Sequence, residues 1–297
     1  MKITHRFFIL AFIIGLLPAM GVSISHAGEL KLNAPAVAYQ PKGFTPDANV
    51  PDLTESQIRT DLRLLRNIGF RGIVTYGSKG VMGKIPEIAR SEGFDGIIIM
   101  GIWDLPSLDE WQNALSQVRF VDGYCLGNEG LGVRYSAEEL LSQMTRLRKA
   151  TGLPVTTSEP IFKYFEPAYQ NILIKATDWI FPIVHPFWDQ PFDPKKAAQW
   201  IIVHCDYLSA VTGRSVIIKE AGFPSAGHVN LNEEAQILFF NEVSRTGLNF
   251  FYFEAFDQPW KKETLNNSSI EAHWGLFKAD GTPKKIVAFL TERWTEK

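Results

Sequence analysis

This chain has few cysteines, a small net charge and no spacing of histidines or cysteines that is typical of a metal site. Its 297 residues include only two cysteines, Cys125 and Cys205, and no His-x-x-x-His or Cys-x-x-Cys spacing, so no metal site is predicted. We expect two buried thiols rather than a disulfide, and no metal or other cofactor. The formal net charge is −2, and the basic residues form no stripe, which argues against nucleic acid as a partner.

Long apolar runs are equally scarce, because only residues 7–20 approach membrane-spanning length. This run follows Lys2 and Arg6 and precedes a Ser-His-Ala sequence, the pattern of a signal peptide with its cleavage site. It is shorter than the ~20 residues that a membrane-spanning helix needs. The sequence predicts a signal peptide over 1–27 and then one exported domain over 28–297. We expect that domain to be periplasmic or extracellular, monomeric and not stably inserted in a membrane.

Short apolar runs alternate with helical patterns along the rest of the chain. The runs are continuous rather than alternating, as expected for strands that are covered on both faces. Eight such units predict an α/β fold, a closed (β/α)8 TIM barrel. No Gly-rich phosphate loop follows the first run, which disfavours an open doubly wound sheet. The predicted strands are Ala34–Tyr39, Gly72–Tyr76, Gly96–Met100, Phe120–Leu126, Pro154–Thr157, Trp179–Val184, Val216–Lys219 and Phe250–Glu254.

Polar and aromatic residues follow these predicted strands at the end where such barrels keep their chemistry. Buried polar groups cost stability unless they are paired, so their concentration at one end predicts a binding site. The residues expected there are Tyr39, Tyr76, Trp103, Asn128, Glu129, Glu159, His185, Glu220, Glu254, Asp257 and Trp260.

Two of these residues, Glu129 and Glu220, each end an apolar run. Two carboxyls at one cleft can cleave a glycosidic bond: one protonates the leaving oxygen, and the other stays ionised and attacks the anomeric carbon. Asn128 can hydrogen-bond a sugar hydroxyl beside the reacting carbon. Adjacent residues of a regular strand point to opposite faces, so no ion pair between Lys219 and Glu220 is expected.

Four segments together resemble glycoside hydrolase family 17, especially its microbial branch. Residues 126–129 (Leu-Gly-Asn-Glu) resemble its acid/base motif, and residues 219–225 (Lys-Glu-Ala-Gly-Phe-Pro-Ser) resemble its nucleophile motif. Residues 251–261 resemble its eighth strand, and residues 271–277 its final signature. The resemblance implies a (β/α)8 barrel that acts on β-1,3-glucan with retention of configuration.

The resemblance also implies roles for individual residues. Glu129 would be the acid/base and Glu220 the nucleophile, and Lys261 and Glu271 would be charged neighbours of the nucleophile. Further sugar contacts are expected from Phe223 and Trp274 in the same motifs, beside the residues named above. The chain departs from the family pattern at three positions: Val74 replaces an arginine, Phe223 a tryptophan and Gln258 a glutamate.

Several functions remain open on the sequence alone. A β-1,3-glucan hydrolase and a β-1,3-glucanosyltransferase would use the same two carboxyls, with water or a sugar as the acceptor. A non-catalytic β-glucan-binding barrel would have no use for two intact acids. A related enzyme acting on another β-glycan is a further alternative.

Overall fold

The computed structural model describes residues 30, 32–46, 53–190, 192–264 and 269–295. The predicted signal peptide lies outside these residues. In the described part of the chain, parallel strands pair in the order β5-β4-β3-β2-β1-β8-β7-β6. They are β1 (Ala36–Ala38), β2 (Gly72–Val74), β3 (Ile98–Ile102), β4 (Gly123–Leu126), β5 (Val155–Thr156), β6 (Ile183–Val184), β7 (Ile217–Ala221) and β8 (Asn249–Tyr252).

The remaining gap, between β5 and β6, is bridged just beyond the end of β5. The Ile183 amide donates to the Glu159 carbonyl at 2.9 Å, and Pro160 forms a parallel bridge with Ile183. The Thr156 hydroxyl donates to the Trp179 carbonyl at 2.8 Å. The predicted (β/α)8 barrel is therefore confirmed. Each observed strand overlaps its predicted run, but β6 is shorter than predicted and β7 continues through Glu220 to Ala221.

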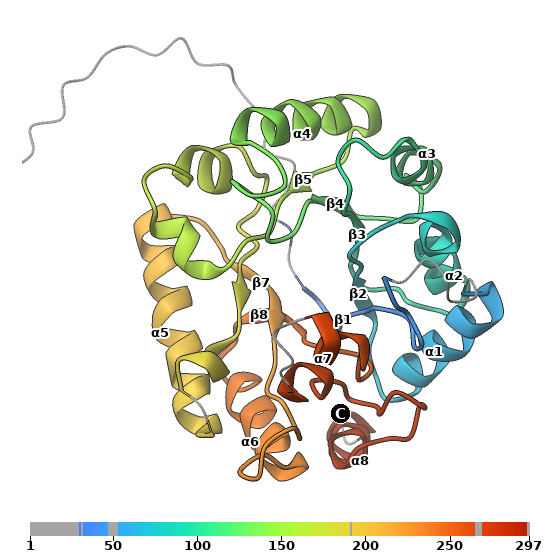
Figure 1. The fold of residues 1–297 in the computed structure, drawn as a ribbon, viewed down its shortest axis with the longest axis vertical. Coiled ribbons are helices and arrows are strands. Elements are labelled where there is room, and N and C mark those ends of the chain that lie inside the picture. The colour runs from blue at the N-terminus through green and yellow to red at the C-terminus, as the bar shows by residue number, and fades with distance from the viewer. Residues whose placement is uncertain (1–29, 31, 47–52, 191, 265–268, 296–297) are drawn as a thin grey trace, which may run out of the picture.

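Helices surround the strands in a ring (Figure 1). Local sequence signals mark several of their ends. Thr54 forms a full capping box with Gln57, and Gly152 and Gly213 end their helices in left-handed conformations. The helices are α1 (Glu55–Asn67), α2 (Ile85–Ser91), α3 (Leu108–Ser116), α4 (Ala137–Thr151), α5 (Pro194–Thr212), α6 (Glu233–Val243), α7 (Trp260–Thr264) and α8 (Lys285–Thr295).

The connection from β5 to β6 is irregular. It contains a 3-10 turn at Ile161–Phe165 and a π turn at Asn171–Lys175, where the other connections carry α-helices. Pro160 and Pro167 flank the first turn, and a proline disfavours helical backbone at the residue before it. This side of the barrel therefore departs from a regular strand-then-helix unit.

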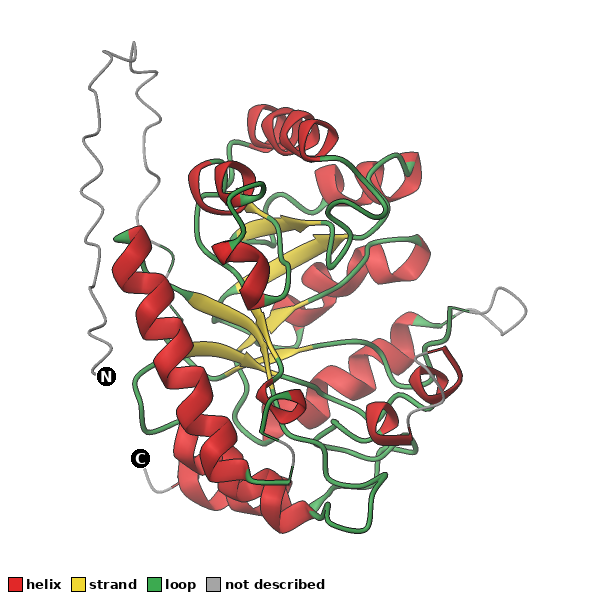
Figure 2. Cartoon of the chain, turned by 60° about the vertical axis from the view of Figure 1, so that its left-hand side comes forward, coloured by secondary structure: helices red, strands yellow, loops and turns green. Residues whose placement is uncertain are grey.

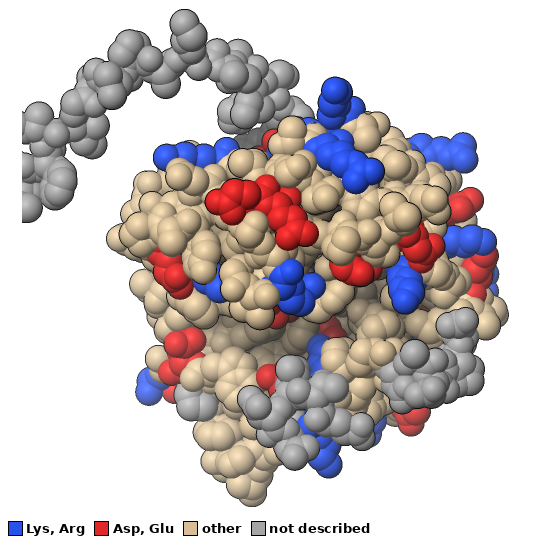
Figure 3. All heavy atoms as spheres, turned by 45° about the horizontal axis from the view of Figure 1, so that its top comes forward, with Lys and Arg blue, Asp and Glu red and all other residues tan. Residues whose placement is uncertain are grey.

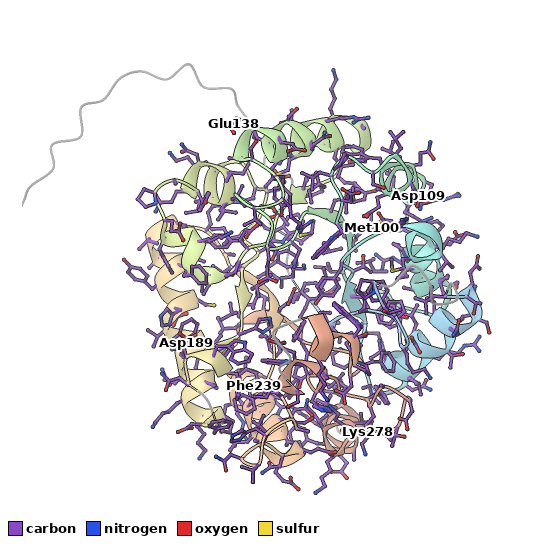
Figure 4. The ribbon with its side chains drawn as sticks, in the orientation of Figure 1. Met100, Asp109, Glu138, Asp189, Phe239 and Lys278 are labelled. Atoms are coloured by element: carbon purple, nitrogen blue, oxygen red, sulfur yellow. The ribbon has the colours of Figure 1, made fainter. Side chains whose placement is uncertain are left out.

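Buried hydrophobic side chains of the strands and helices form one core cluster, and Figure 2 shows the helices arranged around the strands. Met100 of β3 lies toward the centre of the ring, whereas Glu138 and Lys278 lie at its periphery (Figure 4). Both cysteines are buried free thiols, as predicted. None of the described helices combines the length and apolar character needed to cross a membrane.

Candidate active site

The carboxyl ends of the strands gather several of the polar residues that the sequence predicted, among them Glu129, His185 and Glu220. The surface is hollowed on this side, and charged side chains of both signs lie within the hollow (Figure 3). The barrel places the ends of β4 and β7 on the same rim because all its strands run parallel.

The loop after β4 presents Glu129. Glu129 itself has a positive φ of 49°, and its amide donates to the Ser158 carbonyl at 3.0 Å. The next two amides, of Gly130 and Leu131, donate to one oxygen of the fully buried Glu159 at 2.9 and 2.8 Å. Glu159 therefore holds the loop in shape. The sequence placed Glu159 at the mouth without revealing this function.

A bulge in β7 brings two neighbouring side chains to the mouth. Ile218 pairs with Phe250 of β8, but Ala221 pairs with Tyr252, so β7 contains one extra residue between the two pairs. A bulge can redirect a side chain that would otherwise point to the opposite face. Lys219 and Glu220 both lie at the site, with Nζ and Oε1 3.4 Å apart. The expectation that they would not pair is wrong, because it assumed a regular strand.

Glu220 is buried among cationic groups. His185 Nε2 lies 3.1 Å from Glu220 Oε2, and Lys219 lies beside Oε1. Burial by itself would raise the pKa of Glu220, but the charge of Lys219 opposes it, followed by the hydrogen bond and charge of His185 and then the charge of Lys261. Together they lower the pKa of Glu220 to about 2, so this carboxylate stays ionised.

The surroundings of Glu129 have the opposite net effect on its pKa. Its side chain reaches solvent, but surrounding protein atoms reduce its hydration, and this burial raises its pKa above the usual 4.5. The negative charge of Glu220 raises the pKa further, while His185 and Lys219 partly oppose the rise. Asn128 Nδ2 donates to Glu129 Oε2 at 3.5 Å. The pKa of one carboxyl of the mouth is thus raised and the pKa of the other is lowered.

A second acid–cation pair borders the site. Glu254 is buried, and Lys261 Nζ donates to its Oε1 at 2.7 Å. Burial raises the pKa of Glu254 to about 7, despite the opposing charge and hydrogen bond of Lys261. The negative charge of Glu220 also raises it.

Several buried polar atoms around these acids have no hydrogen-bond partner among the described residues. Buried polar atoms in proteins are almost always paired, so a cluster of unpaired ones indicates a place for a polar ligand. The atoms are Tyr76 Oη, His185 Nδ1, Glu220 Oε1, Glu254 Oε2 and Trp274 Nε1. Most of them are neighbours, because the His185 ring lies 5.1 Å from the Trp274 ring and 3.1 Å from Glu220, and Lys219 Nζ contacts both Glu220 and the Tyr76 ring.

Aromatic residues border the hollow on opposite sides. Trp103 is 41% exposed, and the Arg134 guanidinium lies 4.0 Å from its ring centre. Arg134 also donates to the carbonyl oxygens of Trp103 and Asn128, at 3.1 and 2.5 Å. This fixes Trp103 beside the β4 loop. Trp260 donates to Gln258 Oε1 at 3.0 Å and packs against Phe44.

Other predicted contact residues lie away from the carboxyl cluster. The Tyr39 hydroxyl donates to Asp61 of α1 at 3.2 Å, so it is engaged outside the barrel. Phe223 is fully buried and packs against Phe187 and Phe239. Glu271 lies on a short 3-10 turn and forms no ion pair with any other described residue. The described residues also contain no group of three metal-binding side chains.

Comparison with known proteins identifies a family. The model described as BtgE/BtgC glycoside hydrolase domain matches residues 36–275. A probable glucan endo-1,3-beta-glucosidase btgC of Aspergillus flavus is 27% identical over 65% of this chain, which spans about a third (34%) of that protein. A glucan 1,3-beta-glucosidase of Arthroderma benhamiae is 25% identical over 80% of this chain and 86% of its own length.

Solved structures share the fold. The glycoside hydrolase family 17 beta-1,3-glucanosyltransferase of Rhizomucor miehei has a TM-score of 0.68 and 21% identity, over 84% of this chain and 95% of its own. An endo-laminarinase of Formosa has a TM-score of 0.71 and 18% identity, over 88% of this chain and 87% of its own. The family model and the two glucosidases confirm the predicted resemblance, and the solved structures confirm its fold.

Proposed function

Because this chain belongs to the BtgE/BtgC glycoside hydrolase domain family, we propose that it is a retaining glycosidase that cleaves β-1,3-glucosidic bonds in β-glucan. The observation that carries the proposal is that two carboxyls at the mouth of the barrel have pKa values shifted in opposite directions. Glu220 is held ionised, and the pKa of Glu129 is raised. A retaining glycosidase needs this division between a nucleophile and a proton donor.

The first chemical step uses both carboxyls. The Glu129 carboxyl gives its proton to the glycosidic oxygen as the bond from that oxygen to the anomeric carbon breaks. Glu220 attacks the same carbon and forms a glucosyl ester. His185 Nε2 lies 3.1 Å from Oε2 and Lys219 Nζ lies 3.4 Å from Oε1, so neighbouring groups hold both oxygens of the attacking carboxylate. The first sugar product leaves with the proton.

The second step reverses the roles. Glu129, now ionised, takes a proton from water as the water oxygen attacks the anomeric carbon, and the bond to Glu220 breaks. Two inversions give overall retention. Cations around Glu220 favour the carboxylate that leaves in this step.

Recognition of a sugar follows from the unpaired polar atoms. The hydroxyl groups of a glucosyl unit both donate and accept hydrogen bonds, which matches the donor on Trp274 and the acceptors on Glu254 and Glu220. β-1,3-Glucan as the substrate class is supported by the names of the two fungal relatives. An active-site mutant of the Rhizomucor enzyme has also been solved in complex with laminaritriose.

Azide rescue separates the two acids. Glu220→Ala should nearly abolish turnover of an aryl β-glucoside of laminaribiose, and azide should restore it as an α-glycosyl azide by filling the vacated space. Glu129→Ala should keep activity on the aryl substrate, which needs little proton assistance. With azide it should form the β-glycosyl azide. Exchange of the two azide products would reverse the assignments, and full activity in either variant would remove that acid from the mechanism.

Chain transfer to a second sugar is the second candidate, and the position of Trp103 favours it. Its exposed ring lies beside the β4 loop, where an acceptor sugar could stack and exclude water. Trp103→Ala should lower the ratio of elongated to hydrolysed products from laminari-oligosaccharides. Trp188→Ala, which removes another exposed tryptophan, is the matched control. An unchanged ratio in Trp103→Ala would exclude Trp103 as the acceptor platform.

We also propose that the protein is exported, on the basis of the sequence of residues 1–27. Fractionation of expressing cells, with N-terminal sequencing of the mature protein, tests it. A mature chain that begins after Ala27 is expected.

A further inference from the structure

Lys219 is a buried lysine that touches three components of the site. It is 1% exposed, and its ammonium donates to Asn128 Oδ1 of the β4 loop. The same nitrogen lies 3.4 Å from Glu220 Oε1 and 4.5 Å from the centre of the Tyr76 ring. An ammonium group has three N–H bonds, so each of these neighbours can receive one.

The contact with Asn128 determines which way its amide faces. A lysine ammonium only donates, so it must meet the amide oxygen rather than the amide nitrogen. The Asn128 NH2 group is then directed toward Glu129, to which it donates at 3.5 Å. Without the lysine, rotation of the amide by a half turn would present an acceptor in place of this donor.

We propose that Lys219 is a positioning residue that couples the two halves of the site: it keeps the Glu220 carboxylate ionised and fixes the Asn128 amide as a donor to the substrate. This inference deepens the proposed function and rests on it. The β7 bulge makes it possible, because a regular strand would direct Lys219 and Glu220 to opposite faces.

Other charged groups also surround the Glu220 carboxylate. They limit how far the removal of Lys219 can raise its pKa. His185 contacts it from the end of β6, and Lys261 of α7 contributes a weaker positive charge. The acids Glu129 and Glu254 are coupled to it as negative neighbours. The charge of Lys219 is the largest single contribution that lowers the pKa of Glu220. Its removal should therefore raise that pKa without cancelling the whole effect.

The test measures the acidic side of the pH profile of kcat/KM, with an aryl β-laminaribioside as the substrate. Lys219→Met removes the charge at similar length, and Lys219→Gln removes it while keeping a hydrogen-bond donor. Both should raise the pKa of Glu220 by about 1–3 pH units, the effect of one nearby opposite charge on a carboxyl, so that an acidic limb appears in a profile that is level in the wild type. Lys284→Gln is the control, because it removes a buried ammonium that pairs with Asp257 instead of Glu220. Glu220→Ala is measured alongside, and thermal unfolding identifies variants that remain folded.

Each outcome is decisive. An acidic limb in a folded Lys219 variant, with none in Lys284→Gln and no activity in Glu220→Ala, supports the inference. A folded Lys219→Gln with the level wild-type profile overturns it and leaves the proposed function intact if Glu220→Ala is inactive. Activity in Glu220→Ala overturns the proposed function, and the inference with it.

Discussion

At the scale of single residues, the two acids of the mouth are distinguished by their neighbours rather than by their own chemistry. Glu220 is approached by His185 and Lys219. Glu129 is desolvated and also faces the negative charge of Glu220. Each acid therefore helps to set the ionisation of the other. Removing the Glu220 charge should lower the pKa of Glu129 toward its usual value.

The pH dependence of hydrolysis follows from this pair. Activity requires Glu220 ionised and Glu129 protonated. The pKa of Glu220 is about 2, so kcat/KM should stay level on the acidic side until the protein unfolds. It should fall on the alkaline side as Glu129 loses its proton, with a midpoint above 4.5. Glu129→Gln should remove the alkaline fall on an aryl substrate. A wild-type acidic fall near pH 4 to 5 in a folded enzyme would contradict the assignment of Glu220.

The sequence alone predicts the two acids but not the cation between them. Glu129 and Glu220 follow from their positions in apolar runs and from the motifs around them. Val74, where the family has arginine, suggested that a charge partner was missing from the site, yet the mouth contains Lys219. Lys219 was not predicted because no glycine or proline within β7 marks its bulge. Tyr39 was predicted at the mouth but lies outside the barrel, because a residue at the end of a strand can still turn outward.

At the scale of elements, the β4 loop depends on a carboxylate from the next strand connection. Glu159 accepts from two consecutive amides of the loop and pairs with Lys163 at 2.9 Å. This contact joins the loop carrying Glu129 to the irregular segment after β5. The capping signals of the helices were predictable because each lies within a few residues. The contact of Glu159 with the β4 loop joins residues that are 28 or more positions apart, so local sequence patterns do not encode it.

Glu159→Ala should lower both stability and turnover. Two amides lose their acceptor and the Lys163 ammonium loses its carboxylate partner, and breaking such a buried pair costs about 3 kcal/mol in the free energy of unfolding. Displacement of Glu129 by about 1 Å would lower kcat roughly 10²-fold. Denaturant unfolding and steady-state kinetics measure the two effects. Glu138→Ala, at the periphery in Figure 4, should match the wild type. An unchanged kcat in folded Glu159→Ala would show that the loop keeps its shape without the Glu159 carboxylate.

At the scale of the whole molecule, the barrel is least regular at the seam between β5 and β6. Arginine side chains reinforce it from the end opposite the mouth. Arg214 donates to the carbonyl oxygens of Ile174, Thr177 and Asp178. Arg148 donates to the Asp178 carboxylate at 2.8 Å. The closed fold was predictable from the alternating pattern, but this reinforcement was not, because its contacts join residues 30 or more positions apart.

Arg214→Ala should destabilise the protein while leaving its chemistry unchanged. Three partly buried carbonyls would lose a charged donor, at a cost of roughly 3 kcal/mol. For a domain of this size that lowers Tm by roughly 5–10 °C. The kcat of the folded variant at low temperature should equal that of the wild type, because Arg214 binds the seam at the end of the barrel opposite the mouth. Arg245→Ala, at an exposed position, is the control. A wild-type Tm would show that the seam does not need Arg214.

The covalent intermediate tests the central claim most directly. A 2-deoxy-2-fluoro-β-laminaribiosyl fluoride should form a glycosyl-enzyme that breaks down slowly, because the fluorine destabilises the oxocarbenium-like transition state and slows both steps. Peptide mass spectrometry should then place one added fluorosugar disaccharide on Glu220. Labelling of Glu129 instead, or hydrolysis of the reagent without any adduct and with the α-anomer as first product, would contradict the account.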